Sequence, residues 1–193
     1  FPSTPSWAIE SDQNAAFLGE HLAAGDITGD GIADLIVGAP RYDNLTNIDA
    51  GRVFVYVGSE EGLPELFSWT SNSSEAGAKF GQQVAFLGDV NGDSIGDFAI
   101  GTPNGTLITA NEGYVDFYLG RPQGPPAQAD ARLRSNQSAA QFGRRIKGLG
   151  DLNGDGYADF AVGAPLYDGG STNEGRISLY FGGAPLNLAA SVV

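Results

Sequence analysis

Apolar residues come along this chain in short runs, and no stretch has the period of an amphipathic helix. Residues 35–37, 98–100 and 160–162 are three-residue apolar runs, each followed within a few positions by glycine and proline. Residues 53–57 are apolar at every position, which is typical of a strand that other sheets cover on both faces. Runs of this kind predict β-strands, and we therefore expect an all-β protein.

The same pattern occurs three times along the chain. Its reference points are Asp26, Asp89 and Asp151, which lie 63 and 62 residues apart. A Phe-Gly or Leu-Gly pair precedes each aspartate, and a Gly-Ala-Pro or Gly-Thr-Pro turn and a strand between two glycines follow it. Four landmarks in register over three copies indicate an internal repeat. We place the repeats at approximately 17–79, 80–141 and 142–193, preceded by an outer strand within 1–16, in a single segment 1–193.

Each repeat has room for four short antiparallel strands, with the fourth at 66–70 in the first copy and at 131–134 in the second. Four strands in about 62 residues describe one blade of a β-propeller, and propellers close with roughly four to eight blades. Three blades therefore form an incomplete propeller unless further blades join them. The segment around Trp7 is similar to the outer strand around Trp69, since each tryptophan follows a serine. We expect as partners further blades, or other copies of this chain that accept the Trp7 strand on their third blade.

An acidic loop joins the first two strands of each repeat. It has aspartate at positions 1, 5 and 9 and threonine or asparagine at position 3, and position 7 can offer a backbone carbonyl. Three carboxylates so close together repel one another unless a cation lies among them. Oxygen ligands in a flexible loop favour Ca²⁺, so we predict about three calcium ions, one per repeat. The candidate ligands are Asp26, Thr28, Asp30, Ile32 and Asp34; Asp89, Asn91, Asp93, Ile95 and Asp97; and Asp151, Asn153, Asp155, Tyr157 and Asp159.

The EF-hand begins with a similar acidic loop but needs an acidic residue at position 12 and a helix on each side. Position 12 is Val37, Ile100 or Val162 here, inside a predicted strand, and this excludes the EF-hand. A solvated acidic turn would explain one such loop, but not three in register. The second loop has Ser94 where the other two have glycine, and a positive φ there would cost of order 1 kcal/mol.

Composition narrows the function classes. Ten Lys and Arg against 23 Asp and Glu give a net charge of −13, which argues against nucleic-acid binding. No apolar run approaches the roughly 18 residues needed to span a membrane. The absence of cysteine removes disulfides and thiol catalysis. The single histidine, His21, lies in a predicted strand and has no partner in an obvious catalytic constellation.

The Phe-Gly pair, the Asp-x-Asn-x-Asp-Gly-x-x-Asp loop and the Gly-Ala-Pro turn resemble the FG-GAP repeats of integrin α-subunit propellers and their bacterial or archaeal relatives. The resemblance covers about Phe17 to Gly182. It implies structural Ca²⁺ at the matching aspartates, an adhesion or interaction role, and an extracellular or cell-surface location. The chain departs from the integrin pattern because it has three repeats rather than seven, no cysteine and no Arg-Gly-Asp triplet. A bacterial or archaeal relative, or a propeller fragment, fits better than a complete animal receptor.

Three function classes remain. The first is a calcium-binding extracellular adhesion module with a protein or glycan ligand. The second is a structural protein that assembles into rings or filaments by strand addition between chains. The third is a glycan-active enzyme, which would need paired carboxylates; we predict no enzyme and no catalytic residues, because the clustered aspartates are assigned to the ions. Four Asn-x-Ser/Thr triplets are glycosylation candidates, at Asn44, Asn72, Asn104 and Asn136.

Overall fold

The computed structural model describes residues 4–188, which form three antiparallel β-sheets. No helix is found in this range, and hence none that could cross a membrane. The first sheet contains β1 (His21–Gly25), β2 (Asp34–Ala39), β3 (Arg52–Tyr56) and β4 (Trp69–Asn72). The second contains β5 (Gln83–Gly88), β6 (Asp97–Thr102), β7 (Tyr114–Tyr118) and β8 (Ala131–Arg134). The third contains β9 (Arg145–Gly150), β10 (Asp159–Ala164) and β11 (Arg176–Tyr180).

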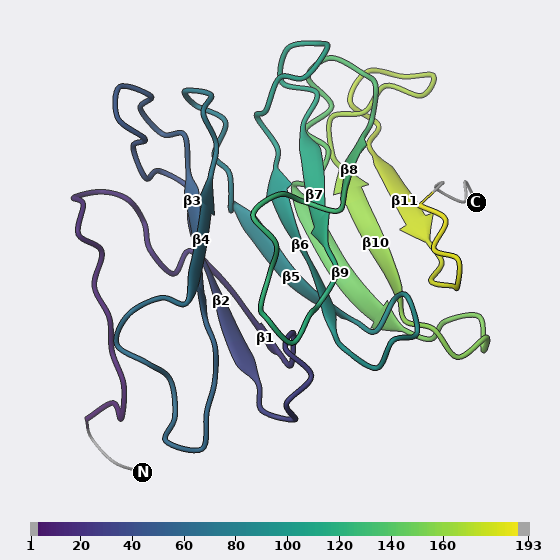
Figure 1. Ribbon diagram of the computed structural model, residues 1–193. Coiled ribbons are helices and arrows are strands. Elements are labelled where there is room, and N and C mark those ends of the chain that lie inside the picture. Colours follow the sequence, from purple (N-terminus) through teal and green to yellow (C-terminus); the bar gives the residue numbers. More distant parts are fainter. Residues whose placement is uncertain (1–3, 189–193) are drawn as a thin grey trace.

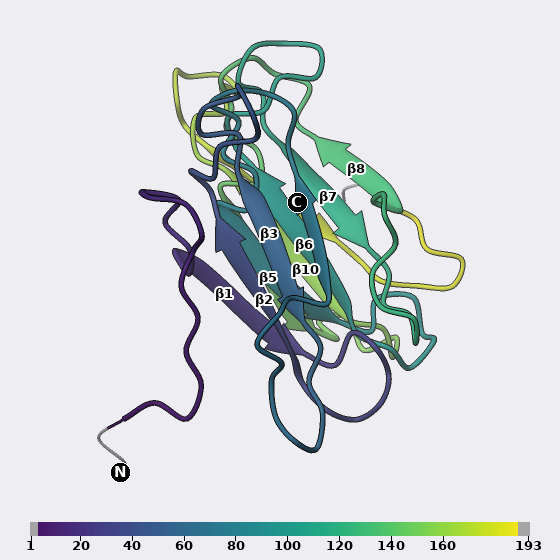
Figure 2. The same ribbon diagram turned by 60° about the vertical axis from the view of Figure 1, so that its left-hand side comes forward.

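The sheets follow one another as the blades of a propeller do (Figure 1). Within each sheet the strands are hydrogen-bonded in sequence order, and each is antiparallel to its neighbours. The second view shows the sheets lying face to face (Figure 2). The series of three sheets is open and does not close into a ring. The prediction of an all-β protein made of propeller blades is confirmed.

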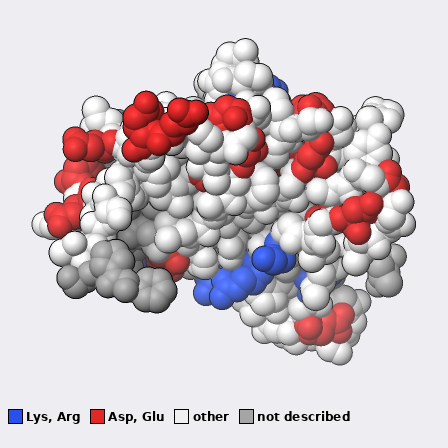
Figure 3. All heavy atoms as spheres, turned by 90° about the horizontal axis from the view of Figure 1, so that it is seen from below, with Lys and Arg blue, Asp and Glu red and all other residues white. Residues whose placement is uncertain are grey.

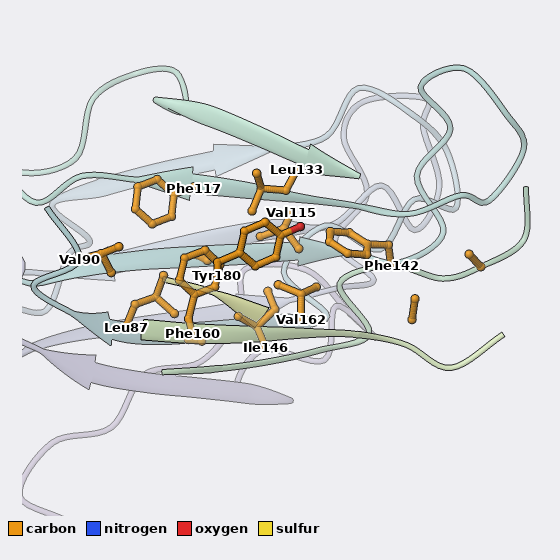
Figure 4. Packing of buried hydrophobic residues seen from close by; sticks show 14 residues of the cluster. Leu87, Val90, Val115, Phe117, Leu133, Phe142, Ile146, Phe160, Val162 and Tyr180 are labelled. Carbon is orange, nitrogen blue, oxygen red and sulfur yellow. The ribbon is translucent and has the colours of Figure 1, made fainter. Parts of the chain in front are cut away.

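Alternation along the strands builds one apolar layer between each pair of sheets. Between the first two sheets, Val53 and Val55 of β3 meet Phe98 and Tyr118 of the second sheet. Between the second and third, Phe117 of β7 lies on Phe160 of β10 with ring centroids 5.8 Å apart. Figure 4 shows this second layer, in which residues of β7 and β8 face those of β9, β10 and β11. Burial of these layers holds successive blades together.

Three sequence-based expectations differ from the structure. The fourth strand of the first sheet is Trp69–Asn72 rather than 66–70, because it pairs with Arg52–Val55 of β3. Residues 4–16 form no strand, since no strand in residues 4–188 pairs with them. The third sheet has three strands in the described range, and Leu186 and Leu188 pack against the layer between the second and third sheets.

The tryptophan equivalence holds even though the N-terminal strand does not form. The indole of Trp69 donates to the carbonyl of Pro126 at 3.1 Å and packs edge-on against Tyr118 at 5.4 Å. The indole of Trp7 donates to the carbonyl of Pro64 at 3.1 Å and packs edge-on against Tyr56 at 5.2 Å. Each tryptophan therefore packs against the next blade in the series. Trp69 therefore lies between the first two blades, whereas Trp7 covers the outer face of the first blade.

Candidate metal centre

The three acidic loops lie at one end of the sheets, the lower end in Figure 1, where each joins the first strand of a blade to the second. Figure 3 views the molecule from that end and shows acidic side chains spread widely over the surface. The fold therefore brings the sequence-predicted residues together within each loop, in the same place on each blade. Each blade carries one loop, and each of the first two loops is hydrogen-bonded to the loop of the following blade.

The aspartate at position 1 organises its own loop. One carboxylate oxygen of Asp26 accepts the amide of Gly29 at 2.6 Å, and the other accepts the amide of Gly31 at 2.8 Å. Asp89 holds the amides of Gly92 and Ser94 in the same way, at 2.6 and 2.8 Å. In the third loop the equivalent distances, from Asp151 to Gly154 and Gly156, are 2.6 and 2.9 Å.

The sharp turn after position 5 requires a left-handed backbone. At position 6, Gly31 and Gly156 have φ of 85° and 94°, and Ser94 has φ of 71°. A side chain in this region meets steric strain that glycine avoids. Ser94 thus has the positive φ to which the sequence analysis attached a strain of order 1 kcal/mol.

The aspartate at position 9 is fully buried and braces two segments. Asp97 accepts the amide of Val90, in its own loop, and the amide of Gly120, which follows β7, both at 2.9 Å. Asp34 bridges Ile27 and Gly58 at the same distances. Asp159 does the same with Leu152 and Gly182, at 2.8 and 2.9 Å. The sequence predicted only a metal ligand at position 9. It did not show that this aspartate also links its loop to the end of the third strand, because Gly120, the partner of Asp97 there, lies 23 residues further along the chain.

Position 5 is exposed and position 7 presents an unpaired carbonyl. Asp30, Asp93 and Asp155 each accept the amide of the residue at position 7, at 2.8 to 3.0 Å, and their side chains reach solvent. No backbone amide of another described residue donates to the carbonyl at position 7, which belongs to Ile32, Ile95 or Tyr157. At position 3, the amides of Asn91 and Asn153 donate to the position-5 carboxylates at 2.9 Å, whereas Thr28 is buried.

The ionisation of these carboxyl groups follows their surroundings. Burial raises the pKa of Asp97 to about 7, although the amides of Gly120 and Val90 oppose the change and Asp93 and Asp89 add to it. Burial also raises the pKa of Asp34. The pKa of Asp26 is lowered, because four backbone amides outweigh its partial burial. Burial therefore disfavours the charged form of Asp34 and Asp97, whereas backbone amides favour the charged form of Asp26.

The carboxylates of each loop are bound to backbone amides and do not converge on one point. Within residues 4–188, no group of three or more histidine, aspartate or glutamate side chains has an arrangement that could hold a metal ion. The chemistry of the candidate ligands still fits Ca²⁺, because every one of them would bind through oxygen. The position-7 carbonyls also accept no hydrogen bond from a described backbone amide, so their oxygens are available. Ion binding would need the exposed position-5 side chains to turn from the amides they now accept.

Each of the first two loops is fastened to the following blade. The carbonyl of Asp26 accepts the amide of Gly96 at 3.0 Å, and that of Asp89 accepts the amide of Ala158 at 2.8 Å. The residues after them, Ile27 and Val90, are fully buried. Leu152, the equivalent residue of the third loop, has no following blade in the described chain and is 59% exposed. No signal within a single repeat could have shown this linkage, which depends on how blades stack.

Comparison with known proteins gives a consistent set of relatives. The family model "FG-GAP repeat" matches residues 18–56, 80–118 and 148–180. Integrin alpha-PS2 of Drosophila melanogaster is 35% identical over 170 residues, covering 81% of this chain and 12% of that protein. Integrin alpha-4 of Xenopus laevis is 37% identical over 158 residues, covering 79% of this chain and 15% of that protein. The phosphatidylinositol-glycan-specific phospholipase D of Bos taurus is 29% identical over 176 residues, covering 86% of this chain and 21% of that protein.

Proposed function

Since the chain belongs to the FG-GAP repeat family and is related to integrin α-subunits, we propose that it is a calcium-binding adhesion or interaction module. Its span is 12% to 21% of the length of these relatives, so ligand and location are proposals as well. On its similarity to integrin α-subunits we propose an extracellular location for this chain.

One observation supports calcium binding above the others. All three loops have the same hydrogen-bonded geometry, in which the position-1 aspartate gathers the amides of positions 4 and 6 within 2.6 to 2.9 Å. A buried position-9 aspartate and an unpaired carbonyl complete each loop. Three solvated turns would not need aspartate at positions 1, 5 and 9 of every loop. A bound cation would neutralise the carboxylates that otherwise repel one another.

The ligands we propose are the oxygen donors at positions 1, 3, 5, 7 and 9 of each loop. The position-1 and position-9 aspartates are held by backbone amides. The position-5 aspartate is exposed and would turn toward the ion by giving up the amide of position 7. When bound, Ca²⁺ would supply positive charge at the base of each blade. It would thereby stiffen the connection between the first two strands and, through Gly96 and Ala158, the junction with the next blade.

Calorimetric titration of the metal-free chain with Ca²⁺ tests this proposal. We expect about three sites, and the single changes Asp30→Asn, Asp93→Asn and Asp155→Asn should each remove or weaken one site. The matched control is Glu61→Gln, an exposed acidic residue outside the loops. No heat of binding in the parent chain, or equal loss in the control, would contradict the assignment.

The ligand of the module is proposed to be a protein or a glycan, and catalysis is not part of its role. The phospholipase D relative carries a related segment, so the alternative of an enzyme needs a direct test. We expect no turnover of generic glycosides or phosphodiesters by the calcium-loaded chain, and binding on an array of glycans or surface proteins. Turnover that the Asp93→Asn change abolishes would instead make this segment catalytic.

A further inference from the structure

Acidic loops of adjacent blades are joined by a backbone hydrogen bond at one repeated position. The amide of Gly96, in the second loop, donates to the carbonyl of Asp26, in the first loop, at 3.0 Å. The amide of Ala158, in the third loop, donates to the carbonyl of Asp89, in the second loop, at 2.8 Å. Gly96 and Ala158 both stand at position 8, so position 1 of one loop accepts the amide of position 8 in the next.

Each of these amides shares its peptide unit with a proposed calcium ligand. The amide of Gly96 forms one peptide unit with the carbonyl of Ile95, at position 7 of the second loop. The amide of Ala158 does so with the carbonyl of Tyr157, at position 7 of the third loop. A peptide unit is planar and trans, so fixing its N–H also fixes its C=O. Donation by the N–H makes that carbonyl oxygen a stronger acceptor as well. Each of the first two loops therefore orients a proposed ligand of the loop after it.

The side chain at position 7 makes a second contact with the preceding loop. A Cβ on Gly92, at position 4 of the second loop, would lie 2.4 Å from Cε1 of Tyr157. A Cβ on Gly29, at position 4 of the first loop, would lie 2.9 Å from Cγ1 of Ile95. The amides of these two glycines are the ones that the position-1 carboxylates accept at 2.6 Å. The position-7 side chain thus packs on the turn that the preceding position-1 aspartate organises.

We propose that the calcium sites of adjacent blades are coupled, so that occupancy of one loop raises the affinity of the loop beside it and, by linkage, the reverse. The carboxylate and the carbonyl of Asp89 belong to one residue, so a cation that restrains the carboxylate also restrains the carbonyl that holds the third loop. Order in one loop then removes part of the cost of ordering the next. Ile95 and Tyr157 are the positioning residues of the two junctions. This inference rests on the calcium binding proposed above and adds an interaction between the sites.

Charge alone would give the opposite sign. Divalent cations in neighbouring loops repel each other, so a purely electrostatic interaction would make the second ion bind more weakly. Sites that strengthen each other need a structural link, which the shared peptide unit provides. Within residues 4–188 no backbone hydrogen bond joins the first loop to the third, so coupling should be greater across each junction than between these two loops.

Calcium titration of the full chain, followed by nitrogen–proton correlation NMR, measures each site separately. The amides of Gly29, Gly92 and Gly154 lie at position 4, one in each loop, and their resonances report the occupancy of their own site. Resonances outside the loops show in every variant whether the fold is retained.

Two exposed position-5 aspartates allow one site to be disabled at a time. Beyond the loss of its own site, Asp93→Asn should weaken binding at both the first and the third loop by at least about fivefold. Asp30→Asn should weaken the second loop more than the third. The control Glu61→Gln removes the same charge at an exposed position outside the loops and should leave all three affinities unchanged.

Tyr157→Ala tests the junction itself, because it removes the ring from Gly92 and leaves the backbone carbonyl of position 7 in place. The third loop should then respond less to Asp93→Asn than it does in the parent chain, and Tyr157→Phe, which keeps the ring, should restore the response. An equal response with alanine would overturn the role of Tyr157. Loops that bind Ca²⁺ independently of one another would overturn the coupling and leave the calcium proposal intact, whereas no binding in any loop would overturn both.

Discussion

Replacement of a position-9 aspartate should reveal its structural role apart from any metal. Asp97 accepts two buried amide donors, those of Val90 and Gly120, both at 2.9 Å. Asp97→Ala leaves both donors without a partner inside the protein. An unsatisfied buried donor costs about 1–3 kcal/mol, so the free energy of unfolding should fall by about 2–6 kcal/mol.

Asp159 provides the matched comparison because its environment differs in one respect. It holds Leu152 and Gly182 with the same geometry, but these hydrogen bonds are only partly buried. Water can reach the freed amides, so each lost bond should cost about 0.5–1.5 kcal/mol and Asp159→Ala about 1–3 kcal/mol in total. Asp97→Ala should therefore lower the free energy of unfolding about twice as much as Asp159→Ala. Asp34→Ala should behave like Asp97→Ala, because its two hydrogen bonds are also buried.

Urea denaturation in chelator at pH 6, followed by tryptophan fluorescence, measures these differences. The chelator removes the contribution of metal, and pH 6 lies below the Asp97 pKa of about 7, so the cost of burying its charge is small. Asp97→Asn, which keeps one acceptor oxygen, should lie between the parent and Asp97→Ala. Equal destabilisation by Asp97→Ala and Asp159→Ala, within about 0.5 kcal/mol, would refute the reasoning from burial.

Three further predictions concern the same loops. Chelation should lower the melting temperature by at least about 10 °C, because an ion at a hundredfold excess over its Kd stabilises by about 2.7 kcal/mol per site; Asp155→Ala should reproduce the share of the third loop, and an unchanged melting curve would show that the loops are acidic turns. Ser94→Gly should stabilise the protein by about 0.5–1 kcal/mol in urea denaturation, since φ is 71° there and glycine relieves the strain, whereas Gly156→Ser should do the reverse. In chelator, stability should fall as the pH rises from about 4 to about 7, because the raised pKa of Asp97 lets the folded state keep a proton that the unfolded state releases; Asp97→Asn should flatten this dependence in melts across that range.

Most of the local structure could be predicted from the sequence, because it depends on residues close together in the chain. Apolar runs such as Phe98–Ile100, ended by Gly and Pro, are sufficient to identify strands and their turns. The loop turn is equally local, since Asp89 organises amides three to five residues ahead of it and position 6 shows where φ must be positive. The same strands and loop then occur in three copies along the chain, and a regular repeat of four-stranded units predicts propeller blades.

The tertiary structure decided everything that depends on a neighbouring blade. The segment around Trp7 has the packing of an outer strand but forms none, because a strand needs a partner and no described strand pairs with it. Asp97 is a brace because Gly120 comes close only when β6 and β7 pair. Val115 and Ile177 are both β-branched apolar residues at equivalent positions of the repeat. Val115 is nevertheless fully buried, and Ile177 is 77% exposed. The sequence shows which side chains are apolar and gain free energy from burial, and only the packing of one blade on the next determines which of them are buried.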